Sequence, residues 1–146
     1  MKRFKYSLEN VLHYKEQILD SIKAEHGTLL AQIRKKEAEI QELENKLVSA
    51  QKKQDVQIKD ICLYGMYISE MEDQIRKKQE QLKLLQQQEE KKKVQVIAAK
   101  IDTSRYEKLK DRRQSEYEKA AKKAQELFIE EFASRTARYS QNREVI

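Results

Sequence analysis

The sequence predicts an all-α protein, a long two-helix antiparallel coiled-coil hairpin whose second helix is longer than the first and overhangs it. Two observations predict this fold. The chain has 146 residues, of which only two are glycine, none is proline and 38% are charged. This composition is typical of long helices and supplies few residues for turns. In addition, apolar residues recur at alternating steps of three and four, which is the pattern of a coiled-coil seam.

The strongest apolar repeat runs from Ile61 to Leu85. One row recurs every seven residues, and a second row follows three residues later, interrupted only by Lys78. The members of the two rows are Ile61, Ile68, Ile75 and Leu82, then Tyr64, Met71 and Leu85. Together the rows form one narrow stripe along a helix. So regular a period argues against a disordered chain, although the mean hydropathy is −0.96.

A first helix is predicted over about residues 5–51, with Ser7 as a partial N-cap signal. Its apolar positions are Leu8, Val11, Ile18, Ile22, Leu29, Ile33, Ile40, Leu43 and Leu47. Two successive steps of four, from Glu25 to Leu29 to Ile33, form a stutter that unwinds the supercoil locally. Gly27 lies in this stretch, which we interpret as the soft point of the first helix.

The turn is placed at about residues 52–58, because the apolar signal thins between Ser49 and Lys59. Asp55 is the best cap for the second helix. No glycine or proline marks the turn, so an unbroken helix through this stretch remains the alternative. Gly65 follows inside the seam, and we interpret it as a helical glycine that permits close approach of the two helices.

The second helix is predicted over about residues 59–140, followed by a short C-terminal tail, and residues 1–146 form a single coiled-coil domain. A reversal near residue 55 pairs residue i with about residue 110 − i. This register brings Ile40 to Met71 and Leu43 to Ile68, and it places Phe4 near Tyr106.

The predicted hairpin leaves roughly thirty residues of the second helix beyond the end of the first, at 1.5 Å of rise per residue. This overhang carries an apolar cluster of Leu127, Phe128, Ile129 and Phe132. Exposed apolar clusters usually mark partner surfaces. Self-association and fraying are the alternatives.

Charge and cysteine content narrow the class of protein. The 31 basic and 25 acidic residues give a net charge of +6 and an isoelectric point of about 9.2, but both signs are mixed along the chain. Mixed charge is typical of the solvated flanks of a coiled coil, so nucleic-acid binding is the less favoured interpretation. Cys62 is the only cysteine, which excludes an intrachain disulfide. No signal peptide or membrane span is evident, so we expect a cytoplasmic protein.

No catalytic, cofactor or metal site is predicted. His13 and His26 are thirteen residues apart and have no acidic or cysteine partner at metal-ligand spacing. Two isolated glycines cannot form a phosphate-binding loop. The sequence therefore indicates a protein that is not an enzyme and that binds no cofactor.

Two stretches resemble the FliJ family of bacterial flagellar export proteins. One is the opening Phe4–Glu16, and the other is Tyr64–Met71 followed by Ile75, which is similar to the family signature just after the hairpin loop. The chain length, the lack of proline and the stretch Leu127–Phe132 agree with the resemblance. The chain departs from the family in having no glycine in the presumed loop.

The resemblance implies a stalk-like coiled coil of the flagellar type III export apparatus, which serves motility, at the inner face of the cell membrane at the flagellar base. The implied partners are the export ATPase hexamer, the cytoplasmic part of the export-gate membrane protein, and export chaperones. The gate contact would lie on Leu43, Tyr67, Met71 and Gln74. The contact with the ATPase ring would lie on Phe4, Leu8, Leu12, Leu127, Phe128 and Phe132. Met71 also lies on the seam, so a core position is the competing interpretation for it.

Two further interpretations stay open. The chain also fits the equivalent stalk of an injectisome, which shares the hairpin, and a generic coiled-coil scaffold that forms homodimers through the overhang.

Overall fold

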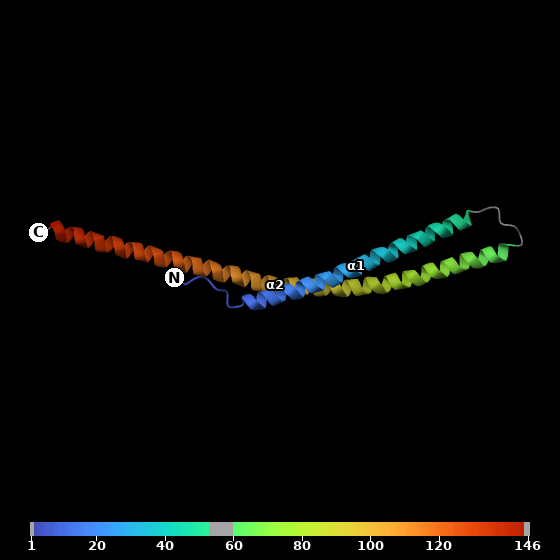
Figure 1. Cartoon of the computed structure of the whole chain (residues 1–146), viewed down its shortest axis with the longest axis horizontal. Coiled ribbons are helices and arrows are strands. Elements are labelled where there is room, and N and C mark those ends of the chain that lie inside the picture. The colour runs from blue at the N-terminus through green and yellow to red at the C-terminus, as the bar shows by residue number, and fades with distance from the viewer. Residues whose placement is uncertain (1, 53–59, 145–146) are drawn as a thin grey trace. The chain divides into compact units, whose positions relative to one another are not determined.

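The computed structural model of the protein describes residues 2–52 and 60–144. It contains two helices, α1 (Glu9–Gln51) and α2 (Ile61–Glu144), which pack against each other and run in opposite directions (Figure 1). The described residues form no strand. The predicted all-α, two-helix hairpin is therefore confirmed, and the alternative of one unbroken helix is wrong.

The helix ends lie within four residues of the predicted ones, and α2 extends through most of the predicted C-terminal tail. α1 ends at Gln51, while α2 begins at Ile61 and continues to Glu144. α1 begins at Glu9, four residues later than predicted, and the acidic side chain there suits the positive end of the helix dipole. Ser7 does not directly precede the helix, and its Oγ instead accepts a hydrogen bond of 2.9 Å from Arg113. The predicted cap Asp55 and most of the predicted turn lie outside the described residues.

Contacts divide the chain into two units, each of which contains a stretch of both helices. Unit 1 comprises Met1–Glu16 and Ile101–Ile146, and unit 2 comprises Gln17–Lys100. In unit 2 the seam buries apolar side chains from α1 and α2, namely Ile33, Ile40, Ala50, Met71, Ile75 and Val96. This core is thin, as expected for a coiled coil, because each helix buries only a narrow stripe.

The helices pair in a register that differs from the predicted one. In unit 2, residue i lies opposite about residue 115 − i, since His26 contacts Glu89 and Tyr64 contacts Ala50. The long side chains of Lys36 and Lys78 reach slightly further along the facing helix, to Gln81 and Glu39. The predicted value of about 110 was too small by about five residues. Both apolar rows of each helix can pair with either row of the other, so the apolar pattern alone fits more than one register.

Unit 1 is held by the segment before α1 as well as by α1 itself. Tyr6 is buried, and its hydroxyl donates a hydrogen bond of 3.1 Å to the carbonyl oxygen of Tyr106. Phe4 packs on Tyr117, with ring centroids 5.4 Å apart, so its predicted position near Tyr106 was wrong. The shift follows from the register and from the irregular backbone of residues 2–8.

Polar pairs accompany this packing in unit 1. Lys15 lies 2.7 Å from Asp102, and the hydrogen bond to that carboxylate is the largest cause that raises the pKa of Lys15. Lys110 lies 2.9 Å from Glu9, whose hydrogen bond likewise raises the lysine pKa. Each pair joins α1 to α2 within the unit.

Neither glycine is required by the packing. A Cβ built on Gly27 or on Gly65 would meet nothing within 4 Å, and neither residue has a positive φ. The interpretation of Gly65 as a point of close helix approach was therefore wrong. Both residues are plain helix positions at which glycine weakens the helix.

We expect Gly27→Ala and Gly65→Ala each to raise the free energy of unfolding by about 0.5–1 kcal/mol, because alanine restricts the unfolded chain and fits the helix. Urea unfolding followed by helical circular dichroism measures this. The exposed Ala31 lies near Gly27 on α1, and Ala31→Gly should lower stability by a similar amount. A loss of stability in either alanine variant would contradict the open space around these glycines.

Candidate protein-binding surfaces

The four residues predicted for the gate contact come together in unit 2. Leu43, Tyr67, Met71 and Gln74 line a groove of about 250 Å³, together with Lys46 and Glu70. We call it the loop-proximal groove. α1 supplies Leu43 and Lys46, and α2 supplies the other four residues. Because both helices contribute, this groove exists only when the helices hold one particular register.

The groove residues differ in how much of their surface a partner can reach. Tyr67 is 51% exposed, whereas Met71 is 5% exposed and belongs to the seam. Leu43 is half-buried and Gln74 is exposed. Tyr67 and Gln74 therefore offer contact area directly, while Met71 supports the floor of the groove.

Further exposed large hydrophobic side chains in unit 2 are Val48 on α1 and Ile61, Leu63 and Met66 on α2. Val48, Leu63 and Met66 were missed by the sequence reasoning, which placed Ile61 in the seam, where the structure leaves it exposed. Of these, Val48, Leu63 and Met66 lie off the seam rows, and that displacement is the signal that could have identified them. Exposed apolar residues gathered in one region are typical of protein-binding surfaces.

The N-terminal residues predicted for ring contact are mostly covered within unit 1. Leu12 is 4% exposed, and Leu8 and Phe4 are half-buried. Phe4 rests on Tyr117, and Arg113 lies over the ring of the neighbouring Tyr6 at 5.8 Å from its centroid. These side chains thus hold the segment to α2 in the structure, and Tyr6 is the buried anchor that sequence reasoning missed.

The C-terminal part of α2, in contrast, is exposed. From residue 118 to residue 143 every side chain is exposed except that of Ala121, which is half-buried. The exposed fractions of the C-terminal apolar cluster are 54% for Leu127, 68% for Phe128, 57% for Ile129 and 66% for Phe132. Phe128 and Phe132 are four residues apart and so share one face of the helix.

The expectation of no metal site concerns the histidine, cysteine and acidic side chains. No group of three or more histidine, cysteine, aspartate or glutamate side chains among them could hold a metal ion. His26 lies between the helices of unit 2, with Nε2 2.8 Å from Glu89 Oε1, and Cys62 is exposed. Within the described residues, neither α1 nor α2 contains a stretch apolar enough for a membrane-crossing helix.

Comparison with known proteins gives one match. A family model described as "Flagellar FliJ protein" matches residues 4–142 of the 146-residue chain. The comparisons with curated proteins and with solved structures give no match.

Burial separates the two groove residues Met71 and Tyr67 in a way that stability can test. Met71→Ala should lower the free energy of unfolding by about 2–5 kcal/mol, because it empties a buried seam position. Tyr67→Ala should change it by no more than about 0.5 kcal/mol, since the side chain is half exposed to water. Urea unfolding measures both. Equal losses in the two variants would show that Tyr67 belongs to the core.

Proposed function

Because the chain belongs to the flagellar FliJ family, we propose that this flagellar export-related protein is a non-enzymatic, central-stalk-like activator of the export ATPase ring. It also contacts the export gate and export chaperones. The observation that carries the ring contact is the C-terminal apolar cluster, which is exposed on α2.

The construction of the chain suits a stalk. Paired helices provide stiffness with little core, and the charged flanks mix both signs. Exposed ion pairs contribute only about 0–1 kcal/mol each, so a ring can move over such a surface without being held at one place. The C-terminal apolar cluster would supply the stronger, local contact within the ring.

The two predicted parts of the ring contact are not equally accessible. The C-terminal apolar cluster is open to a partner, whereas Leu12 is buried and Leu8 and Phe4 are half-buried. In the proposal, Leu127, Phe128 and Phe132 therefore make the direct contact. Phe4, Leu8 and Leu12 contribute by holding the N-terminal segment and α1 against α2.

ATP hydrolysis by the cognate export ATPase tests the ring contact. The native chain should stimulate hydrolysis, and Phe128→Asp combined with Phe132→Asp should abolish the stimulation, because two carboxylates replace the shared apolar face. Leu84→Asp is the matched control, since Leu84 is a 60% exposed apolar residue in unit 2. It should stimulate as the native chain does.

An absence of any effect of the native chain on the ATPase would contradict the stalk. If the molecular mass in solution were then doubled, and the two aspartates returned it to that of the monomer, the coiled-coil scaffold would be the better account. The exposed cluster favours that second candidate equally well. A requirement of the protein for flagellar assembly distinguishes the flagellar stalk from the equivalent stalk of an injectisome.

For the gate contact we propose the loop-proximal groove, with Tyr67 and Gln74 as the directly touching residues and Leu43 and Met71 as its apolar floor. Tyr67 presents an aromatic ring beside an apolar groove, which is the kind of residue found at interface hot spots. Lys46 and Glu70 at the groove offer charges to a polar rim. This contact would bring the protein to the inner face of the cell membrane through the gate.

Binding to the purified cytoplasmic part of the export-gate protein tests this surface. Tyr67→Ala with Gln74→Ala should weaken binding at least tenfold, because a hot-spot side chain contributes more than about 1–2 kcal/mol. Tyr139→Ala removes a 66% exposed tyrosine far along α2 and should bind as the native chain does. Unchanged binding by the groove variant would contradict the assignment, whatever the effect on the ATPase.

A further inference from the structure

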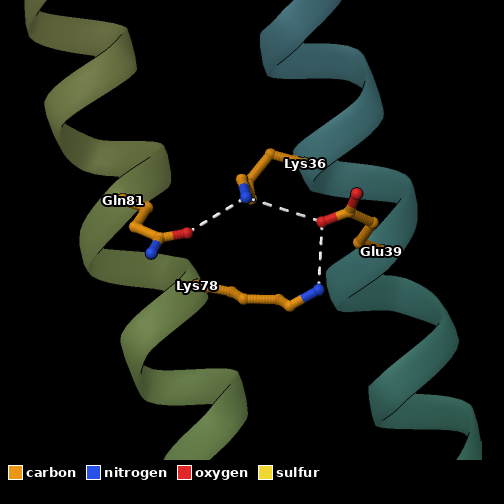
Figure 2. Close-up of polar contacts among 4 residues, drawn as sticks. All are labelled: Lys36, Glu39, Lys78 and Gln81. Carbon is orange, nitrogen blue, oxygen red and sulfur yellow. Dashed lines mark hydrogen bonds and ion pairs between the residues drawn. The ribbon is translucent and has the colours of Figure 1, made fainter.

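A layer of four polar side chains, two from each helix, lies at the seam of unit 2, with Lys36, Glu39 and Lys78 half-buried and Gln81 exposed at its edge. Figure 2 shows the Glu39 carboxylate lying between two lysines, with Lys78 Nζ at 3.0 Å and Lys36 Nζ at 3.5 Å. Lys36 also donates a hydrogen bond of 3.0 Å to Gln81 Oε1. The hydrogen bond from Lys78 is the largest cause that lowers the pKa of Glu39. Lys78 occupies the position where the apolar row breaks.

A second polar pair crosses the same seam. His26 Nε2 lies 2.8 Å from Glu89 Oε1, and the two side chains are only 20% and 19% exposed. Nearby, Lys92 Nζ lies 2.5 Å from Glu25 Oε2. Both contacts agree with the register of about 115 − i, the long lysine side chain reaching slightly further along the facing helix.

The apolar positions alone do not select this register. Both helices repeat every seven residues, so a slide of one heptad again places apolar residues opposite apolar residues. In the observed register of about 115 − i, Ile40 lies opposite Ile75, and a slide of seven residues would place it opposite Ile68 or Leu82. Something other than the apolar rows must therefore distinguish the observed register from its neighbours.

A slide of seven residues, to about 108 − i, would break the four-residue layer. Lys78 would face Gln32, in a stretch from His26 to Lys36 that contains no acidic residue. Glu39 would face Met71, and a charged group against an apolar side chain loses the partner that compensates for its burial.

A slide in the opposite direction is also disfavoured by this layer. Lys78 would then face Lys46, and Glu39 would face Leu85. Like charges across an interface are destabilising, and the carboxylate again meets an apolar side chain.

Either slide would also separate His26 from Glu89. His26 would face Leu82 or Val96, and Glu89 would face Leu19 or Ile33. Each alternative register therefore places polar groups of both layers against apolar or like-charged residues.

We propose that the layer of Lys36, Glu39, Lys78 and Gln81, together with the His26–Glu89 pair, is a register-setting network. It selects one of several helix registers that the apolar seam accepts. Single polar residues at seam positions set register in other coiled coils at a cost in stability. Here the four-residue layer and the His26–Glu89 pair both contribute to setting the register.

The network has a consequence for the loop-proximal groove. In the observed register Leu43 lines the groove together with Met71 and Gln74. After a slide of seven residues, to about 108 − i, Lys36 would take the place of Leu43 beside Met71 and Gln74. Lys78 and Glu39 are thus positioning residues for a surface that they do not line. The network sets the register whether or not the proposed function is correct.

Spin-label distances in the full-length chain test the network. In a Cys62→Ser background, labels are placed at Ala38→Cys and Gln95→Cys, two exposed positions on opposite helices of unit 2. We expect one distance population in this parent. Lys78→Leu combined with Glu89→Leu should add a second population, displaced by roughly 10 Å for a slide of seven residues at 1.5 Å each. Because leucine fills the seam, the helix content should be retained.

The matched control is Lys77→Leu with Glu90→Leu, which changes the same residue types at adjacent exposed positions. It should keep the single population of the parent. A charge exchange, Glu39→Lys with Lys78→Glu, should also keep it, since opposite charges again face each other. A single unshifted population in Lys78→Leu with Glu89→Leu would overturn the proposal. A second population of the same size in the control would do so too.

Discussion

Burial of one narrow apolar stripe between α1 and α2 is the interaction on which the rest of the structure depends. The buried side chains are few and are spread along the helices, among them Ile33, Ile40, Met71 and Ile75. Isolated helices gain little stability on their own, and most of it comes from packing against a partner. The paired stretches of the two helices are therefore stabilised because each covers the apolar stripe of the other. A thin seam also leaves most side chains free to serve as surface.

The polar contacts across the seam have a different task from the apolar ones. Glu39, Lys78 and His26 replace apolar residues at or beside seam positions, and they gain little net stability, since charge pairs that are partly buried lose hydration. Their contribution is to favour one helix register over the others. An apolar stripe with a constant repeat can be buried in several registers. A particular carboxylate can lie opposite a particular lysine in only one of them. The register in turn determines which residues of α1 and α2 share the loop-proximal groove.

The proposed binding surfaces lie in different units and arise in different ways. In unit 2 the loop-proximal groove needs both helices, so it depends on how they pair. In unit 1 the C-terminal apolar cluster lies on α2 alone, and its exposure follows from the absence of cover over residues 118–143 apart from Ala121. Because the loop-proximal groove and the C-terminal apolar cluster consist of different residues, a substitution in one surface can be made without changing the other.

The sequence by itself determined the fold class, the end of α1 at Gln51 and the apolar cluster near the C-terminus, because helical periodicity and the lack of turn residues are local properties. It also identified Leu43, Tyr67, Met71 and Gln74 through family resemblance, but not which of them are exposed. Only the tertiary structure decided the register, the burial of Tyr6 and Leu12, and the packing of Phe4 on Tyr117. The physical reason is that both rows of each helix are apolar, so the apolar pattern alone fits more than one register. Contacts between side chains far apart in the sequence, such as Glu39 with Lys78, are needed to remove that ambiguity.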